Sequence, residues 1–301
     1  MSSPNRQEQI ARALVITVPA LWAINYVVAR KAPGVIDPHT LALGRWGIAG
    51  LLLGLFSWRE LWRERRWLLT AWPQHLVLGS LGMLVCGAWV YIAGHSTSAM
   101  NIALIYSASP VLIMIASVVW LKERMSPLQR LGVALAMFGV LHVIVKGHWQ
   151  TLAQLQFSAG DLWIAASTLA WAFYAILLKK WPSPLSASAR LAVVAAGGCL
   201  VLLPFAAWET LTPGGPGWST QALGLTLVAA LLPGLGAYWA YGYAQQVLGA
   251  SRVAVSLYLG PLYGAIAAWG LLNEQLQGFH LMGALLILPG VVLATRRARS
   301  S

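Results

Sequence analysis

Long apolar segments separated by short polar breaks run along the whole chain. A helix that crosses a bilayer needs about 20 apolar residues at a rise of about 1.5 Å each. Ten segments come near this length, and we expect each to be a membrane-spanning helix. They cover residues 13–30, 38–57, 74–95, 99–121, 128–146, 160–179, 187–208, 221–245, 252–272 and 280–296. The breaks contain proline, glycine or clustered charge, as at Pro33-Gly34 and from Arg59 to Arg66.

The second part of the chain repeats the first. Residues 99–140 and 250–291 align without a gap and are identical at 11 of 42 positions. A polar link at about 147–158 separates two groups of five segments, so we predict one repeat over 1–148 and a second over 149–301. Two similar halves in a membrane are typical of transporters, whose site lies where the halves meet. The shared positions include Pro110/Pro261, Glu123/Glu274, Gly132/Gly283 and Gly139/Gly290.

Composition supports the membrane class. The chain is 58% hydrophobic and 9% charged, whereas a soluble domain has about 25% charged residues. The net charge of +12 does not indicate a nucleic-acid partner, because the charges lie in short clusters between apolar segments. The partner that this composition requires is the lipid bilayer.

The distribution of lysine and arginine gives the orientation. With the N-terminus in the cytoplasm, 16 of these residues lie on the cytoplasmic side and three on the other side, as the positive-inside rule requires. Both termini are therefore predicted to be cytoplasmic. Five spans per repeat is an odd number, so the second repeat is inverted. The predicted fold is an all-α integral membrane protein with ten transmembrane helices, arranged as two inverted five-helix repeats around a central cavity.

The repeat motifs resemble a known family. The segments around Trp22 and Trp171 match each other, and Pro110 and Pro261 are each followed by glutamate and glycine at equal spacing. From residue 12 to 296 the chain resembles the drug/metabolite transporter superfamily, in particular its EamA-type exporters and, among these, the YddG-type aromatic amino-acid exporters. The resemblance implies a bacterial inner-membrane location and a cavity lined by helices 1, 3, 4, 6, 8 and 9. It also implies that helices 5 and 10 are peripheral, often at a homodimer contact.

Aromatic and small polar side chains recur at helical spacing inside several spans. Trp163, Ser167, Trp171 and Tyr174 share one face of the sixth span. Such side chains combine an apolar body with a polar tip, which suits a cavity for a semi-polar solute; ordinary packing between helices explains the same pattern. The candidate substrate-cavity residues are Trp22, Asn25, Tyr26, Arg45, Tyr91, Asn101, Tyr106, Trp163, Ser167, Trp171, Tyr174, Tyr238, Tyr241 and Tyr258.

Arg45 is the lysine or arginine that lies well inside a predicted span, whereas the others fall in the breaks or near the ends of spans. A cation at the centre of a span costs about 2.5–3.5 kcal/mol and usually faces a cavity or a partner. One interpretation is an anchor for the carboxylate of an amino acid or acidic metabolite. The other is that Arg45, about seven residues into its span, extends its charged end to the membrane surface.

Two pairs of equivalent residues are hinge or gate candidates. Pro110 and Pro261 each remove a helix hydrogen bond and can bend their spans at corresponding points. Glu123 and Glu274 end the fourth and ninth spans, where each is either a gate contact or an interfacial residue held by neighbouring cations and backbone groups.

Several classes of chemistry have no pattern in the chain. The six histidines and two cysteines show no metal-ligand spacing, GxxxxGK[ST] is absent, and no nucleophile–base set appears. We therefore predict no metal, no cofactor and no enzymatic activity. No aspartate or glutamate falls in the middle of a span, so no carboxylate proton carrier is predicted either.

The predicted function is secondary export, by alternating access, of aromatic and other uncharged amino acids or similar small metabolites. A multidrug or sugar-phosphate carrier of the same superfamily is the alternative. A phosphate site needs paired cations within the spans, and only Arg45 qualifies. An intramembrane enzyme would need a polar catalytic cluster at one depth, which the sequence does not show.

Overall fold

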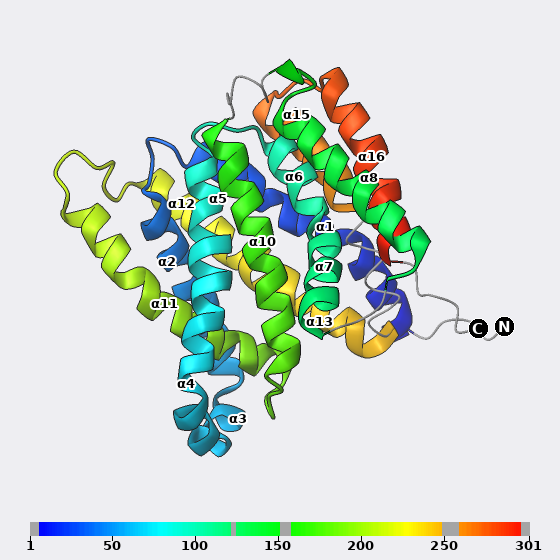
Figure 1. Ribbon diagram of the computed structural model, residues 1–301. Helices are drawn as coiled ribbons and strands as arrows, with labels where there is room; N and C mark the ends of the chain where they lie inside the picture. The colour runs from blue at the N-terminus through cyan, green and yellow to red at the C-terminus, as the bar shows by residue number, and fades with distance from the viewer. Residues whose placement is uncertain (1–5, 122–124, 151–157, 249–258, 296–301) are drawn as a thin grey trace.

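In the computed structural model, residues 6–121, 125–150, 158–248 and 259–295 are described, and every regular element among them is a helix (Figure 1). Glu123 and Tyr258 lie outside these ranges. The first half contains α1 (Arg6–Lys31), α2 (Pro38–Phe56), α3 (Trp58–Arg63), α4 (Arg65–Gly79), the π-helix η1 (Ser80–Ala88), α5 (Trp89–Ala93), α6 (Ala99–Ser107), α7 (Ser109–Leu121) and α8 (Pro127–Ile144). The second half contains α10 (Ala159–Lys180), α11 (Ala187–Leu211), α12 (Thr220–Ala229), the π-helix η2 (Ala230–Gly236), α13 (Ala237–Leu248), α15 (Gly260–Leu272) and α16 (Gly278–Thr295).

All ten predicted apolar segments are mostly helical where the structure describes them, with turns at residues 57, 94–95, 108 and 145–146. Eight helical stretches are long and apolar enough to cross a membrane. The segments predicted at 252–272 and 280–296 coincide with the shorter apolar helices α15 and α16. The all-helical membrane class is therefore confirmed for the described residues, whereas ten spans and the inversion of the second repeat stay predictions.

Local sequence explains where several helices begin. The side chains of Ser98, Ser126, Ser186 and Ser219 each accept a hydrogen bond from the backbone N–H three residues further on. At Ser126 the contact is reciprocal, because the Gln129 side chain accepts from the Ser126 N–H. Such caps satisfy backbone donors that have no partner inside the helix. These serines lie in the polar breaks between the apolar segments.

The third span of each half contains a π-helix. η1 lies between α4 and α5, and η2 lies between α12 and α13. A π turn inside an α-helix is rare and often marks a functional site. In η1 the irregular backbone offers carbonyl groups to other helices: the Ser167 hydroxyl donates to Val85 O at 3.0 Å, and the Tyr106 hydroxyl donates to Cys86 O at 3.4 Å.

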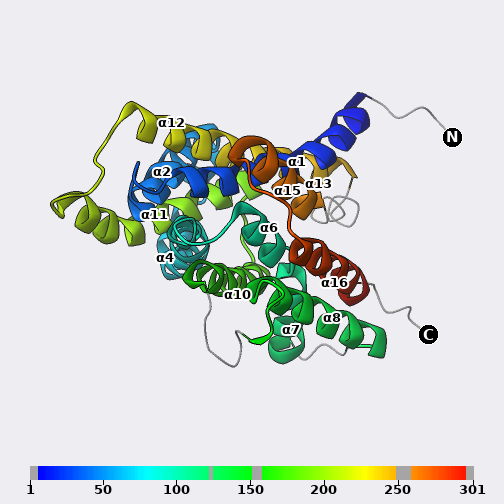
Figure 2. The same cartoon turned by 90° about the horizontal axis from the view of Figure 1, so that it is seen from above.

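Helices α8 and α16 pack against each other at one edge of the molecule (Figure 2). Glycines that the repeat predicts to be equivalent lie at this contact. A Cβ at Gly290 would stand 2.5 Å from Ala136 N, and one at Gly139 would stand 2.7 Å from Ile287 Cγ1. Only glycine permits so close an approach of the backbones. The fifth and tenth helices thus lie at the periphery, as the resemblance implied, with their glycine faces turned to each other within one chain.

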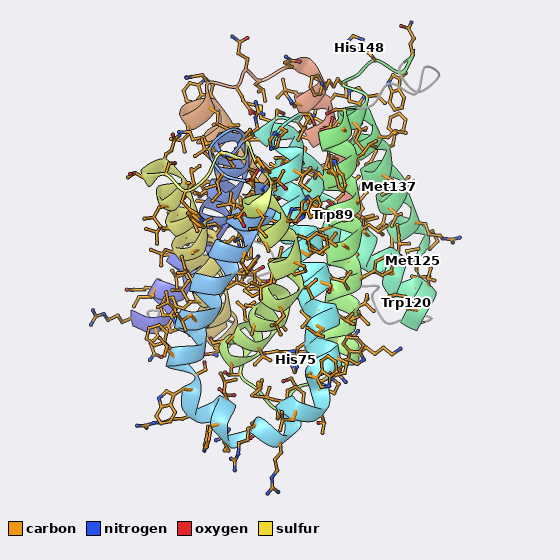
Figure 3. All side chains as sticks on the ribbon, turned by 90° about the vertical axis from the view of Figure 1, so that its left-hand side faces the viewer. His75, Trp89, Trp120, Met125, Met137 and His148 are labelled. Carbon is orange, nitrogen blue, oxygen red and sulfur yellow. The ribbon has the colours of Figure 1, made fainter. Side chains whose placement is uncertain are left out.

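One end of the bundle gathers several turns from both halves. Arg30, at the end of α1, contacts both the turn at 94–98 and Glu274 of the segment 273–277 there, and His148 of the turn at 145–150 lies at this end in Figure 3. Met125 and His75 lie toward the other end. We call the first the outer end, after the orientation that the charge distribution predicts.

Candidate functional site

A cavity of about 290 Å³ lies inside the helix bundle. Its walls come from α1, α2, η1, α6 and α7 of the first half and from α10, α13, α15 and α16 of the second. The first and sixth spans contribute residues, as the resemblance implied, and the second and tenth spans contribute as well. The predicted residues that line the cavity are Trp22, Asn25, Tyr26, Arg45, Tyr106, Trp171, Tyr238 and Tyr241, together with Pro110 and Pro261.

Aromatic side chains form a large part of the cavity wall. The Trp22 ring lies 5.9 Å from the Tyr238 ring and 5.4 Å from the Tyr241 ring, centroid to centroid. Trp46 meets Tyr238 edge to face at 5.9 Å. These distances are in the range of stabilising aromatic pairs. The rings hold one another in place, so the wall is preformed and can accept a flat apolar group.

Arg45 is the cation of this cavity. Its side chain is buried, with 5% of the residue exposed, so it does not extend to the membrane surface. The Nη1 atom donates to Asn25 Oδ1 at 3.0 Å and to the Tyr91 hydroxyl oxygen at 3.3 Å. Tyr91 in turn donates to Asn25 Oδ1 at 2.9 Å. Tyr91 thus does not line the cavity; it lies behind Arg45 and orients it.

The charge of Arg45 has no opposite charge beside it. No carboxylate within the described ranges lies at ion-pair distance from it. Its Nε atom and the neighbouring indole Nε1 of Trp46 are buried without a hydrogen-bond acceptor. The guanidinium lies 4.5 Å from the centroid of the Trp46 ring, which offers partial compensation through a cation–π contact. A buried cation with free donors at a cavity favours an anionic group as its ligand.

Of the four residues predicted on one face of the sixth span, Trp171 lines the cavity and the other three do not. Tyr174 stacks on Trp171 at 5.1 Å and is buried behind it. The Ser167 hydroxyl donates to the backbone carbonyl of Val85 in η1. Trp163 does not line the cavity: it packs edge-on against Trp89 at 4.8 Å and is 36% exposed. Trp163 is about two helical turns from Trp171, at a level where α5 covers α10.

Asn101 belongs to a separate group, which we call the outer polar cluster: Thr97, Asn101, Asp161 and His280. Asp161 Oδ1 accepts hydrogen bonds from the Thr97 hydroxyl and from Asn101 Nδ2, the latter at 3.0 Å. Asn101 Oδ1 lies 3.1 Å from His280 Nε2. The cluster connects α6, α10, α16 and the turn at 94–98, so it joins the two halves instead of lining the cavity.

Glu274 lies beside this cluster. Its carboxylate accepts from the backbone N–H groups of Ala99 at 3.0 Å and Met100 at 3.3 Å, which begin α6. Arg30, at the end of α1, pairs with it at 3.3 Å and also donates to Gly94 O at 2.5 Å. Asn273 has φ = 54°, a left-handed conformation that ends α15 just before Glu274. Glu274 of the second half therefore holds the start of a helix in the first half.

Sequence reasoning missed several residues of these sites, among them Trp46 in the cavity and Thr97, Asp161 and His280 in the outer polar cluster. Trp46 lines the cavity beside Arg45, and its position directly after the intramembrane cation was the available signal. Asp161 is fully buried, although its place in the first turn of α10 is typical of an exposed acidic residue at a helix start. Across the described ranges, no group of three or more His, Cys, Asp or Glu residues is arranged to hold a metal ion.

Comparisons with known proteins match both halves of the chain. The sequence profile described as "EamA-like transporter family" matches residues 9–145 and again 158–296. A protein of Bacillus subtilis (strain 168) named "Uncharacterized transporter YyaM" is 27% identical, over 90% of this chain and 88% of its own. A protein of Escherichia coli (strain K12) named "Probable amino-acid metabolite efflux pump" is 26% identical, over 96% of this chain and 95% of its own. A solved crystal structure superposes with a TM-score of 0.61 at 20% identity, over 95% of this chain and 96% of that chain, which supports the fold.

Proposed function

The chain belongs to the EamA-like transporter family, and on that premise we propose that it exports aromatic and other uncharged amino acids, or similar small metabolites, by alternating access. We place it in the bacterial inner membrane with ten spans, an inverted second repeat and both termini in the cytoplasm. Relatives named as amino-acid metabolite efflux pumps support the substrate class. The observation that carries the proposal is the guanidinium of Arg45, which has no ion-pair partner among the described residues and is the one charged group in the described lining of an aromatic cavity.

A zwitterion complements this cavity group by group. Its carboxylate would pair with the guanidinium of Arg45, which lines the cavity. Its side chain would lie against the rings of Trp22, Trp171 and Tyr238, where burial of apolar area contributes about 25 cal/mol per Å². Its ammonium group can face ring π-systems and hydroxyl oxygens. Selectivity among side chains should be loose, because one methylene changes binding by only about 1–3 kcal/mol.

Size and charge disfavour the alternatives. A volume of about 290 Å³ is at the low end of small-molecule sites, which span about 300–1,000 Å³, so one small metabolite fits better than a drug-sized molecule. A hexose phosphate carries two negative charges near neutral pH, and the cavity offers a single cation. Without a second cation, the remaining charge would be buried unpaired at high cost.

Transport by purified protein in liposomes tests the proposal. Uptake of labelled phenylalanine should be competed by tryptophan, tyrosine and methionine. Phenethylamine, which has the same ring and amine but no carboxylate, should compete weakly, because it cannot occupy the Arg45 donors. If hexose phosphates compete and phenylalanine is not transported, the amino-acid proposal is wrong and Arg45 belongs to a phosphate site.

The orientation has its own test. In a background without Cys86 and Cys199, single cysteines are placed at Gly214, in a turn, and at Arg63, the last residue of α3, which lie at opposite predicted faces. A membrane-impermeant thiol reagent added to intact cells should modify position 214 and leave position 63 unmodified. Modification of position 63 from outside would overturn the assigned topology without bearing on the cavity.

A further inference from the structure

Four carboxylates hold elements together at the ends of the helices, and three of them are fully bonded. Both oxygens of Glu60 accept from Ser186, at 2.5 Å from its N–H and 2.7 Å from its hydroxyl. Glu209 accepts from His39 N at 3.1 Å and from Thr40 N at 2.8 Å, one on each oxygen. Glu274 has a backbone donor on each oxygen as described above. In each of these three carboxylates, both oxygens accept a hydrogen bond.

Asp161 differs from these three. It is 0% exposed, its Oδ1 takes both donors of the outer polar cluster, and its Oδ2 is buried with no hydrogen-bond partner. A buried polar atom without a partner is costly, and a buried carboxylate without a counter-charge is more so. The most deeply buried carboxylate of this group is therefore the one with an unsatisfied oxygen.

The hydrogen bonds around Asp161 form a chain whose donors all point toward its Oδ1 atom. The Gln277 N–H donates to His280 Nδ1 at 3.0 Å, so the neutral imidazole carries its hydrogen on Nε2 and donates to Asn101 Oδ1. That contact fixes the Asn101 amide with its NH₂ group toward Asp161 Oδ1. The chain of donors therefore ends on Oδ1, and none of its members has a second hydrogen directed at Oδ2.

Within the described ranges, no charged side chain pairs directly with Asp161. His280 is one residue removed through Asn101, Glu274 is bonded to the start of α6, and Arg30 is paired with Glu274. Lys146 acts on Asp161 through space from an exposed turn. The packed segments α5, α6, α7 and η1 contain no Asp, Glu, Lys, Arg or His. The one titratable side chain in the later part of α4, His75, lies toward the opposite end of the molecule (Figure 3).

We propose that Asp161 is a proton-binding site that controls the outer end of the protein: its carboxylate form holds that end closed, and a proton taken up on Oδ2 releases it. Two forces favour the carboxylate, the donors on Oδ1 and the amino-terminal end of α10, whose partial positive charge faces the first turn. Burial favours the neutral acid. Because these opposing effects meet on one buried group, a change of pH can shift its state.

Protonation acts directly on contacts between the halves. Thr97 and Asn101 lie within the first family match, and Asp161 and His280 lie within the second. Hydrogen bonds to a carboxylate are roughly twice as strong as those to a neutral acid. The step adds one proton to Oδ2 and breaks no covalent bond. It weakens both bonds on Oδ1, so acid loosens the start of α6 and the turn at 94–98 from α10.

The proposed transport function explains what a pH-controlled outer end would serve. The tests of Asp161 itself need no transported substrate. The first follows the infrared carbonyl band of a protonated carboxyl group in purified protein as pH falls. Asp161→Asn should remove one such band from the titration. Glu209→Gln is the matched control, because Glu209 is also a carboxylate at the outer end but has donors on both oxygens; it should leave that band in place. If Asp161→Asn removes no band, Asp161 does not titrate and the proposal fails.

The second test measures how readily the outer end of the protein opens, by the rate at which a buried cysteine there is labelled. Met100, next to the cluster and 2% exposed, is replaced by cysteine in the background without Cys86 and Cys199. Labelling from outside by an impermeant reagent is divided by labelling of a cysteine at Gly214, which corrects for the pH dependence of thiol reactivity. The normalised rate should rise about tenfold as pH falls, because both hydrogen bonds on Oδ1 become weaker when the carboxylate is protonated. A tenfold change corresponds to about 1.4 kcal/mol over the two bonds.

Substitutions at Asp161, Glu209 and Thr97 show whether protonation of Asp161 causes the faster labelling at low pH. Asp161→Asn should label fast at every pH, and Glu209→Gln should keep the pH response. If Asp161→Asn does not fold, Thr97→Val removes one donor from the carboxylate and should move the midpoint of the response to higher pH. A flat response in the parent protein, a response that survives in Asp161→Asn, or an unmoved midpoint in Thr97→Val would overturn the proposal, whether or not amino acids are transported.

Discussion

Arg45 and Asp161 are buried charges of opposite sign in the same membrane protein, and they are held in similar ways. Each is bound by neutral groups: Arg45 by Asn25 and Tyr91, Asp161 by Thr97 and Asn101. Neither has an ion-pair partner within the described ranges, and each retains one buried polar atom without a hydrogen bond. Their surroundings differ, since Arg45 lines the cavity and Asp161 is not among the residues that line it.

The difference in surroundings suggests a difference in ligand. An unsatisfied charge beside a hollow of about 290 Å³ can be met by the charged group of a whole molecule. An unsatisfied oxygen in close packing can be met only by something that needs almost no room, and a proton is the smallest such ligand. The same electrostatic arrangement therefore supports a substrate site in one place and a proton site in the other. The following predictions test this assignment.

Removal of the cation should have the largest effect. Arg45→Gln keeps hydrogen-bonding capacity but loses the charge, so phenylalanine should bind about a hundredfold more weakly, in line with the loss of a charged hydrogen bond worth up to about 3 kcal/mol. Equilibrium dialysis of purified protein measures it. Arg45→Lys should be intermediate, because it keeps the charge without the planar fork. The acid response of labelling at position 100 should persist; its loss in Arg45→Gln would contradict the separation of the two sites.

The aromatic wall should respond next. Trp171→Ala removes a ring from the cavity and should weaken binding of phenylalanine about tenfold, since an aromatic contact and its buried area together contribute about 1.5 kcal/mol or more. Trp163→Ala is the matched control in the same helix, because Trp163 packs on Trp89 outside the cavity. It should change the melting temperature and leave affinity unaltered. Equal losses of affinity in both variants would argue that these tryptophans act through packing alone.

Glu274 offers a way to loosen the outer end without touching Asp161. Glu274→Gln keeps the shape of the side chain but removes the charge that pairs with Arg30 and faces the start of α6. We expect a loss of stability of about 1–2 kcal/mol and faster labelling at position 100 at every pH. The ratio of labelling between acid and neutral pH should remain. A variant that abolishes this ratio would show that Glu274, and not Asp161, is the titrating group.

The smallest effect should come from Glu60, far from both sites. Its hydrogen bonds from the Ser186 backbone and side chain lower the pKa of this carboxyl group. A carboxyl whose pKa is lower in the folded state stabilises the fold above its ordinary pKa, and this contribution is lost as pH falls through the lowered value. Glu60→Gln should therefore reduce the melting temperature slightly at neutral pH and not in strong acid. A variant that melts equally at neutral pH would indicate that solvent screening cancels the contact.

Helix positions were predictable because length and hydropathy determine them directly. The first eight apolar segments match helices that can span a membrane, and polar breaks supply the serine caps. Trp22, Asn25 and Tyr26 of α1, named as candidates from the sequence, all line the cavity. Periodicity could not show which level of α10 faces the cavity, so Trp171 and Trp163 were grouped although their neighbours differ.

Burial of a charged residue depends on segments that are distant in sequence. Asp161 is near the start of its helix, and distance along α10 indicated an exposed position. It is buried because Thr97, Asn101 and His280 converge on it from positions at least 60 residues away. Trp46 was missed for a similar reason, since its contact with Tyr238 joins α2 to α13. For Trp46 the neighbouring cation was the one local signal, and for Asp161 no local pattern encodes such a convergence.

The π-helices η1 and η2 have a mechanical consequence for the spans that contain them. A π turn holds one residue more than an α turn between hydrogen-bonded partners, and this extra residue can pass along a helix by exchanging one hydrogen bond at a time. Each passage rotates the part of the span on one side against the part on the other, while the helix stays continuous. The third span of each half is therefore expected to behave as two short rods joined by a torsional joint. A transporter with one such joint per half can turn the cavity-facing groups of these spans without sliding a whole helix through the lipid.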